Sequence, residues 1–166
     1  MLWAEVRSRA YELYDRNVMP GLDYALTEVV HCKSKGNKGV ESALDECADL
    51  YLTRVLSCSG SRILVILGEM PKQIVTKKYN LPAHPPVQGP VDVAGRERFV
   101  VFLGAPNSNR LRKFTSDELA PFLPRLRAIL RGATAPRQPN RKSSASVTTE
   151  GEVLVWIATL NPSIPT

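Results

Sequence analysis

The stretch RILVILG at residues 62–68 is a continuous apolar run of strand length that ends at a glycine. Such a run, without polar alternation, is typical of a strand whose two faces are both covered, as in a parallel sheet. Two further runs have a similar character, YALTEVV at 24–30 and RFVVFL at 98–103, and each leads into a polar loop. The sequence therefore predicts three short, buried strands in one α/β domain.

Helical patterns alternate with these runs. Apolar residues recur at helical spacing over 2–14 and over 44–56, which predicts an opening helix and a second helix capped by Ser42. We also expect helices over 73–78 and over 116–130, the last capped by Ser116. The proline-rich segment 80–95 predicts irregular structure. Strands alternating with helices predict a three-layer α/β/α fold with a short parallel sheet.

The composition changes after residue 131. Residues 132–146 are basic and rich in proline and serine, which is typical of a linker. The apolar segment 152–158 predicts a short strand, and the sequence does not determine whether it joins the main sheet. We therefore expect an α/β domain over 1–131, followed by a linker and a short C-terminal strand over 132–166.

Overall composition limits the class of protein. A chain of 166 residues suits one domain, and its net charge of +6 permits a polyanionic partner without requiring one. No apolar run reaches the roughly 18–20 residues that cross a bilayer, and three cysteines form no even disulfide framework. We expect a cytoplasmic protein that does not contact a membrane, with an oligomeric state that the sequence does not define.

The polar segments that follow the three strands are the candidate site. In a parallel sheet the working site lies at the carboxyl ends of the strands. One basic loop follows the first strand and another follows the third; their candidate phosphate contacts are Lys33, Lys35 and Lys38, and Ser108, Arg110, Arg112 and Lys113. Two basic loops at one edge favour a nucleic-acid interface, whereas a solvated turn is the alternative for the second loop.

The order of these segments resembles the uracil-DNA glycosylase superfamily, especially its iron-sulfur branch. LTEVVHCK at 26–33 is similar to that branch's second strand, where a Thr-Asn-Val-Val-Lys-Cys pattern occurs, and ECADLYL at 46–52 is similar to the following helix. ILVILG at 63–68 and VVFLGAPN at 100–107 are similar to the third and fourth strands. The resemblance covers about residues 24–130. It implies a uracil-DNA-glycosylase-like fold that lacks the first strand and its Gly-Glu-x-Pro-Gly loop, since the chain starts after their place.

The resemblance implies base-excision DNA repair, in which the N-glycosidic bond of a flipped uracil or other damaged base is hydrolysed. It places three candidate catalytic positions: Glu28 where the family has a base-reading Asn, Ala105 where it has a His that supports the departing base, and Asn107 in the last loop. A carboxylate cannot donate a hydrogen bond, and losing one donor typically costs about 100- to 1,000-fold in rate.

We therefore expect a DNA glycosylase with impaired activity, acting on single- or double-stranded DNA. A non-catalytic nucleic-acid-binding module that keeps the fold is the alternative. A generic α/β domain without a role on DNA is the third hypothesis.

Cys32 and Cys47 lie fifteen residues apart, close to the spacing of two of the branch's four cluster ligands. The other two ligands belong to a Cys-x-x-Cys that this chain lacks, and two thiolates cannot replace four. Cys47 also lies on the apolar stripe of its helix, where a cysteine is an ordinary core residue. We expect no iron-sulfur cluster and no other cofactor, and interpret both cysteines as vestigial metal positions.

Overall fold

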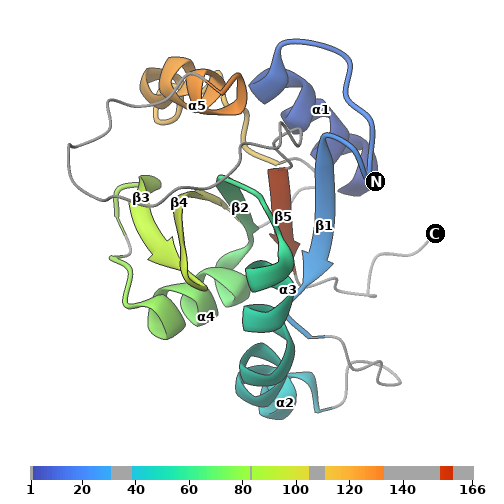
Figure 1. The fold of residues 1–166 in the computed structure, drawn as a ribbon, viewed down its shortest axis with the longest axis vertical. Coiled ribbons are helices and arrows are strands. Elements are labelled where there is room, and N and C mark those ends of the chain that lie inside the picture. The colour runs from blue at the N-terminus through green and yellow to red at the C-terminus, as the bar shows by residue number, and fades with distance from the viewer. Residues whose placement is uncertain (1, 31–38, 83, 105–110, 133–153, 159–166) are drawn as a thin grey trace, which may run out of the picture.

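The computed structural model describes residues 2–30, 39–82, 84–104, 111–132 and 154–158 (Figure 1). The chain is a mixed α/β protein with a five-stranded, mostly parallel sheet. Its elements, in chain order, are α1 (Leu2–Tyr14), β1 (Tyr24–Glu28), α2 (Val40–Cys47), the π-helical turn η2 (Ala48–Leu52), α3 (Thr53–Cys58), β2 (Ile63–Leu67), α4 (Glu69–Tyr79), β3 (Val87–Val93), β4 (Arg96–Leu103), the 3-10 turn η3 (Ala120–Phe122), α5 (Leu123–Leu130) and β5 (Leu154–Ala158).

The strand order in the sheet is β1-β5-β2-β4-β3. The first four strands are parallel, and β3 pairs antiparallel with β4. The C-terminal strand β5 lies inside the sheet, with β1 along one side and β2 along the other (Figure 1). The parallel part of the sheet therefore has four strands, one more than the three predicted from the sequence.

Strand β2 shows why the apolar runs are continuous. All five of its residues are buried, and they point alternately into two cores. Ile63, Val65 and Leu67 join a core with α1 and α5, whereas Leu64 and Ile66 join a core with η2, α3 and α4. The prediction that both faces of this strand are covered is confirmed, and the arrangement is compatible with a three-layer α/β/α fold.

Both predicted helix caps, Ser42 and Ser116, were wrong. Helix α2 begins at Val40 and is capped by Gly39, whose carbonyl accepts a hydrogen bond from Ser42 Oγ at 3.0 Å. Helix α5 begins at Leu123, well after the expected cap at Ser116. The reason for the second error is Pro121, because a proline in a helix interior removes a backbone donor and clashes with the preceding turn.

The prediction of irregular structure over 80–95 was wrong in part, because Val87–Val93 forms strand β3. This strand lies at an edge of the sheet, and its register with β4 shifts between Gln88 and Val91. Pro90 falls within that irregularity, where a missing backbone donor is tolerated. Gly89 beside it has φ 131°, and a Cβ there would lie 2.7 Å from the Arg98 carbonyl oxygen, so only glycine fits.

Asp23 holds the turn that leads into β1. Its carboxylate accepts a hydrogen bond from Arg16 at 2.5 Å and from the Met19 N–H at 2.7 Å. These bonds, above all the one from Arg16, keep the pKa of Asp23 below its usual range.

We expect Asp23→Asn to lower the free energy of unfolding by about 1 kcal/mol at neutral pH. A carboxyl whose pKa is depressed by folding stabilises the protein above its unfolded pKa of about 3.9, and this stabilisation is lost as the pH falls through the folded pKa. Urea unfolding of both proteins at decreasing pH should therefore show the difference shrinking in acid. A difference that stays constant with pH would contradict this role of the charge.

Candidate functional site

Four parallel strands end together at one edge of the sheet. The paired residues across this edge are Glu28 of β1, Ala158 of β5, Leu67 of β2 and Leu103 of β4, each in register with the next. We call this row the carboxyl edge. The sequence predicted a site where the strands end, and the structure brings those ends into one line.

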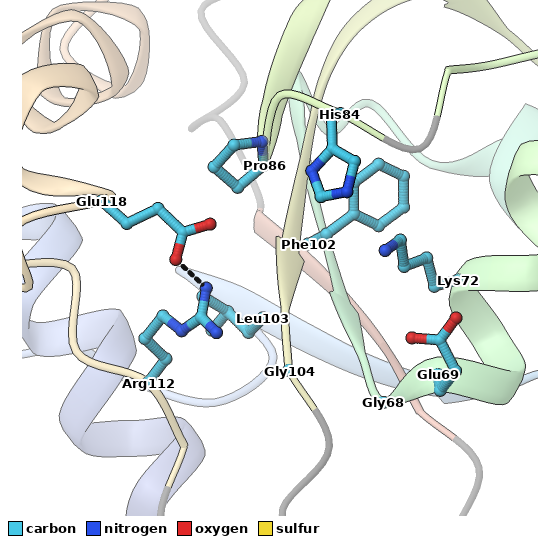
Figure 2. A pocket seen from close by; sticks show the side chains of 10 residues that line it. All are labelled: Gly68, Glu69, Lys72, His84, Pro86, Phe102, Leu103, Gly104, Arg112 and Glu118. Atoms are coloured by element: carbon cyan, nitrogen blue, oxygen red, sulfur yellow. Dashed lines mark hydrogen bonds and ion pairs between the residues drawn. The ribbon is translucent and has the colours of Figure 1, made fainter.

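A pocket of about 180 Å³ opens at the carboxyl edge between the ends of β2 and β4 (Figure 2). It is lined by Gly68, Glu69, Lys72, His84, Pro86, Phe102, Leu103, Gly104, Arg112 and Glu118. The pocket is similar in size to an engineered cavity of about 150 Å³ that binds benzene. It therefore has room for one six-membered ring.

A sharp turn from β2 into α4 forms one wall of the pocket. Gly68 has φ 93°, a conformation that favours glycine, and its N–H donates to the Leu103 carbonyl at 3.2 Å. Helix α4 starts immediately afterwards, at Glu69, earlier than the sequence pattern predicted. Glu69 and Lys72 therefore face the pocket, and the Lys72 ammonium lies 5.8 Å from the centroid of the Phe102 ring, within the range of a cation–π contact.

The loop before β3 forms a second wall. The Phe102 N–H donates to the Pro86 carbonyl at 2.8 Å, which ties this loop to the end of β4. His84 and Pro86 line the pocket from this loop (Figure 2). The apolar part of the lining is therefore fixed by a backbone hydrogen bond as well as by packing.

Arg112 and Glu118 form an ion pair across the third wall (Figure 2). Their side chains are 40% and 48% exposed, so water screens the pair and it contributes little to stability. A ligand can therefore take the place of Glu118 as the partner of Arg112 at a small cost in free energy. Lys72 and Arg112 supply two positive charges to the lining, and Glu69 and Glu118 supply two negative ones.

No family model, curated protein or solved structure matches this chain. The resemblance to the uracil-DNA glycosylases therefore rests on the order of the sequence segments.

Glu28, the candidate base-reading residue, is half-buried at the carboxyl edge and does not line the pocket. Strand β5 lies between β1 and β2, so the backbone of Glu28 is two strand spacings, about 9–10 Å, from the nearer pocket wall. Glu28 and the pocket are therefore two separate positions along one edge.

Of the predicted phosphate contacts, Arg112 lines the pocket and Lys113 is exposed beside it. The remaining predicted positions at the edge lie outside the described residues: Cys32, Lys33, Lys35, Lys38, Ala105, Asn107, Ser108 and Arg110. The sequence did not predict the roles of Glu69, Lys72, Phe102 and Glu118. Only residues 68–72 lie where the sequence predicted a site, because they directly follow a buried strand.

Cys47 is buried, 3% exposed, next to the core formed by η2 and α3. Within the described ranges, no group of three or more His, Cys, Asp or Glu side chains is arranged to hold a metal ion. The same ranges contain no helix with the length and apolarity needed to cross a membrane.

Proposed function

We propose that the chain is a uracil-DNA-glycosylase-like protein of base-excision DNA repair, which binds single- or double-stranded DNA along its carboxyl edge. The observation that carries this proposal is the row of four parallel strand ends with a pocket beside it, because sheets of this type bind ligands there. Both basic loops of the sequence support it, since they follow β1 and β4, which end at this edge.

Strand β5 supports the proposal by supplying a fourth parallel strand. In doubly wound sheets of order 2-1-3-4-5, the first strand lies between the second and the third. Here β1 and β2, which resemble the family's second and third strands, flank β5 in the same way. In the sequence β5 is followed by TLNPS at 159–163, with a proline at the fourth position as in Gly-Glu-x-Pro-Gly. This supports a permuted glycosylase sheet, in which a C-terminal strand replaces the N-terminal one.

In this proposal a flipped base faces Glu28. The carboxylate accepts a hydrogen bond from a base N–H but donates none to a base carbonyl. Ala105 provides no side-chain donor for the anionic base that departs when the N-glycosidic bond breaks. Hydrolysis should therefore be slower than in an enzyme that keeps these donors, by about 100- to 1,000-fold per donor.

A direct assay tests the proposal. The full chain is incubated with a single-stranded oligonucleotide that contains one uracil, and alkali then reveals abasic sites. We expect slow strand cleavage that depends on uracil, and binding that weakens steeply between about 50 and about 200 mM salt. Arg112→Gln should reduce the slope of log affinity against log salt by about one.

Arg96→Gln is the matched control, because Arg96 is exposed at the opposite end of β4. An equal loss of binding in both variants would contradict a specific role for the carboxyl edge. Absence of both cleavage and binding would leave the chain as an α/β domain without a role on DNA.

The non-catalytic binding module is the second candidate, favoured by the distance between Glu28 and the pocket. A side chain that does not reach the concave part of the edge is poorly placed to act on a ligand held there. A salt-sensitive complex without any cleavage would support this candidate.

A further inference from the structure

We propose that Glu118 is a built-in competitor for a phosphate group at Arg112. In the free protein its carboxylate takes the place on the guanidinium that a phosphate of the DNA strand would occupy, so binding requires its displacement. This rests on the proposed function, in which Arg112 is a phosphate contact at the carboxyl edge. It adds a residue that weakens this contact until a phosphate replaces the carboxylate.

The guanidinium of Arg112 lies at the end of β4 and is only partly used. Its Nη1 donates a hydrogen bond to Glu118 Oε2 (Figure 2), whereas no described residue accepts one from Nη2 or Nε. A Cβ built on Gly104 would lie 3.7 Å from Nη2, which places this nitrogen beside the carboxyl end of β4. Arg112 therefore has an unused donor beside the strand end while Glu118 holds its other terminal nitrogen.

A phosphate matches this guanidinium better than Glu118 does. Arginine can form two parallel hydrogen bonds with a phosphate, whereas the pair with Glu118 joins one nitrogen to one oxygen. A phosphodiester carries one negative charge, as the carboxylate does, so the exchange keeps Arg112 paired. Both side chains are exposed, and the exchange therefore leaves neither charge buried without a partner.

The fold fixes the two side chains on one short segment. Phe114 and Leu119 are fully buried and anchor this segment, and the Leu119 N–H donates to the Ser116 carbonyl at 2.9 Å. Glu118 is therefore tethered near Arg112 at a constant effective concentration, whatever the dilution of the protein. A lone phosphate must overcome this competition with one contact, whereas a DNA strand can add contacts elsewhere along the carboxyl edge.

Asp117 supplies a matched control. It is exposed, lies next to Glu118 in the chain and forms no ion pair with any described residue. Asp117→Asn and Glu118→Gln each remove one negative charge from the same turn, so they change the long-range attraction for DNA by a similar amount. A difference between these variants therefore measures the contact of Glu118 with Arg112.

Fluorescence anisotropy of the full chain with a labelled single-stranded oligonucleotide, at about 50 mM salt, tests the competition. We expect Glu118→Gln to bind about two- to fivefold more tightly than Asp117→Asn, the range set by a screened surface ion pair. In the background of Arg112→Gln the two variants should bind equally, because no guanidinium remains to be released. Equal affinities in the native background, or a difference that persists without Arg112, would overturn the inference.

Inorganic phosphate separates this inference from the proposed function. It is titrated into the isotopically labelled chain while the Nε–Hε signal of Arg112 is followed by NMR. We expect the half-saturating phosphate concentration to be about two- to fivefold lower in Glu118→Gln than in Asp117→Asn. That result without DNA binding would retain the competitor and remove the DNA strand as the source of the phosphate. DNA binding of equal affinity in both variants would retain the proposed function and remove the competitor, and no response to either probe would overturn both.

Discussion

Replacing Trp156 with alanine is expected to lower the free energy of unfolding by about 3–5 kcal/mol, the usual cost of removing a large aromatic side chain from a core. Trp156 is fully buried at the centre of β5, in register with Leu26 of β1 and Val65 of β2. Its indole belongs to the core that α1 and α5 cover. The loss would therefore weaken the contact of one helical layer with the sheet as well as the strand itself.

Urea unfolding followed by far-UV circular dichroism measures this loss, and Trp156→Phe is the matched control. The indole Nε1 of Trp156 is buried without a hydrogen-bond partner among the described residues. Phenylalanine keeps most of the apolar volume and removes that unpaired donor, so it should cost less than about 1.5 kcal/mol. A loss below about 1 kcal/mol for Trp156→Ala would show that β5 is not a structural part of the sheet.

Replacing Arg98 with methionine is expected to lower the free energy of unfolding by about 3 kcal/mol or more, since hydrogen bonds to a charged group contribute about 1.5–3 kcal/mol and buried carbonyls would lose their donor. The Arg98 guanidinium is fully buried and donates to four carbonyl oxygens, of Leu56 (2.6 Å), Ser59 (2.7 Å), Ser61 (2.9 Å) and Val93 (2.7 Å). Burial lowers the pKa of Arg98 below its usual value. Arg98 thus joins the end of α3, the start of β2 and the end of β3.

Two further variants separate the charge from the shape of the side chain. Arg98→Lys keeps the charge, but one ammonium cannot reach carbonyls arranged around a planar fork, so it should recover only part of the stability. Arg96→Met, at an exposed position two residues earlier, should change the unfolding midpoint little. Similar midpoints for Arg98→Met and Arg96→Met would contradict the role of Arg98.

The sequence predicted the place of the candidate site better than its residues. Arg112 was expected at the edge because it follows a buried strand, and it does line the pocket. Lys72 lies in a segment that follows a buried strand, but Phe102 carries no such signal, since it lies inside an apolar run. They meet only because β2 and β4 pair in register, which aligns the start of α4 with the end of β4.

The spacing of apolar residues in the sequence was enough to predict those strands and helices whose pattern lies within a single element. The apolar run 63–67 had to be covered on both faces, because its alternate residues have no polar member to turn toward water. The opening helix likewise follows from apolar residues at helical spacing, and the structure confirms it over Leu2–Tyr14. Tertiary structure alone decided that β5 lies between β1 and β2. A five-residue apolar segment carries no local information about its neighbours, and its pairing partners stand roughly 90 to 130 residues away in the chain.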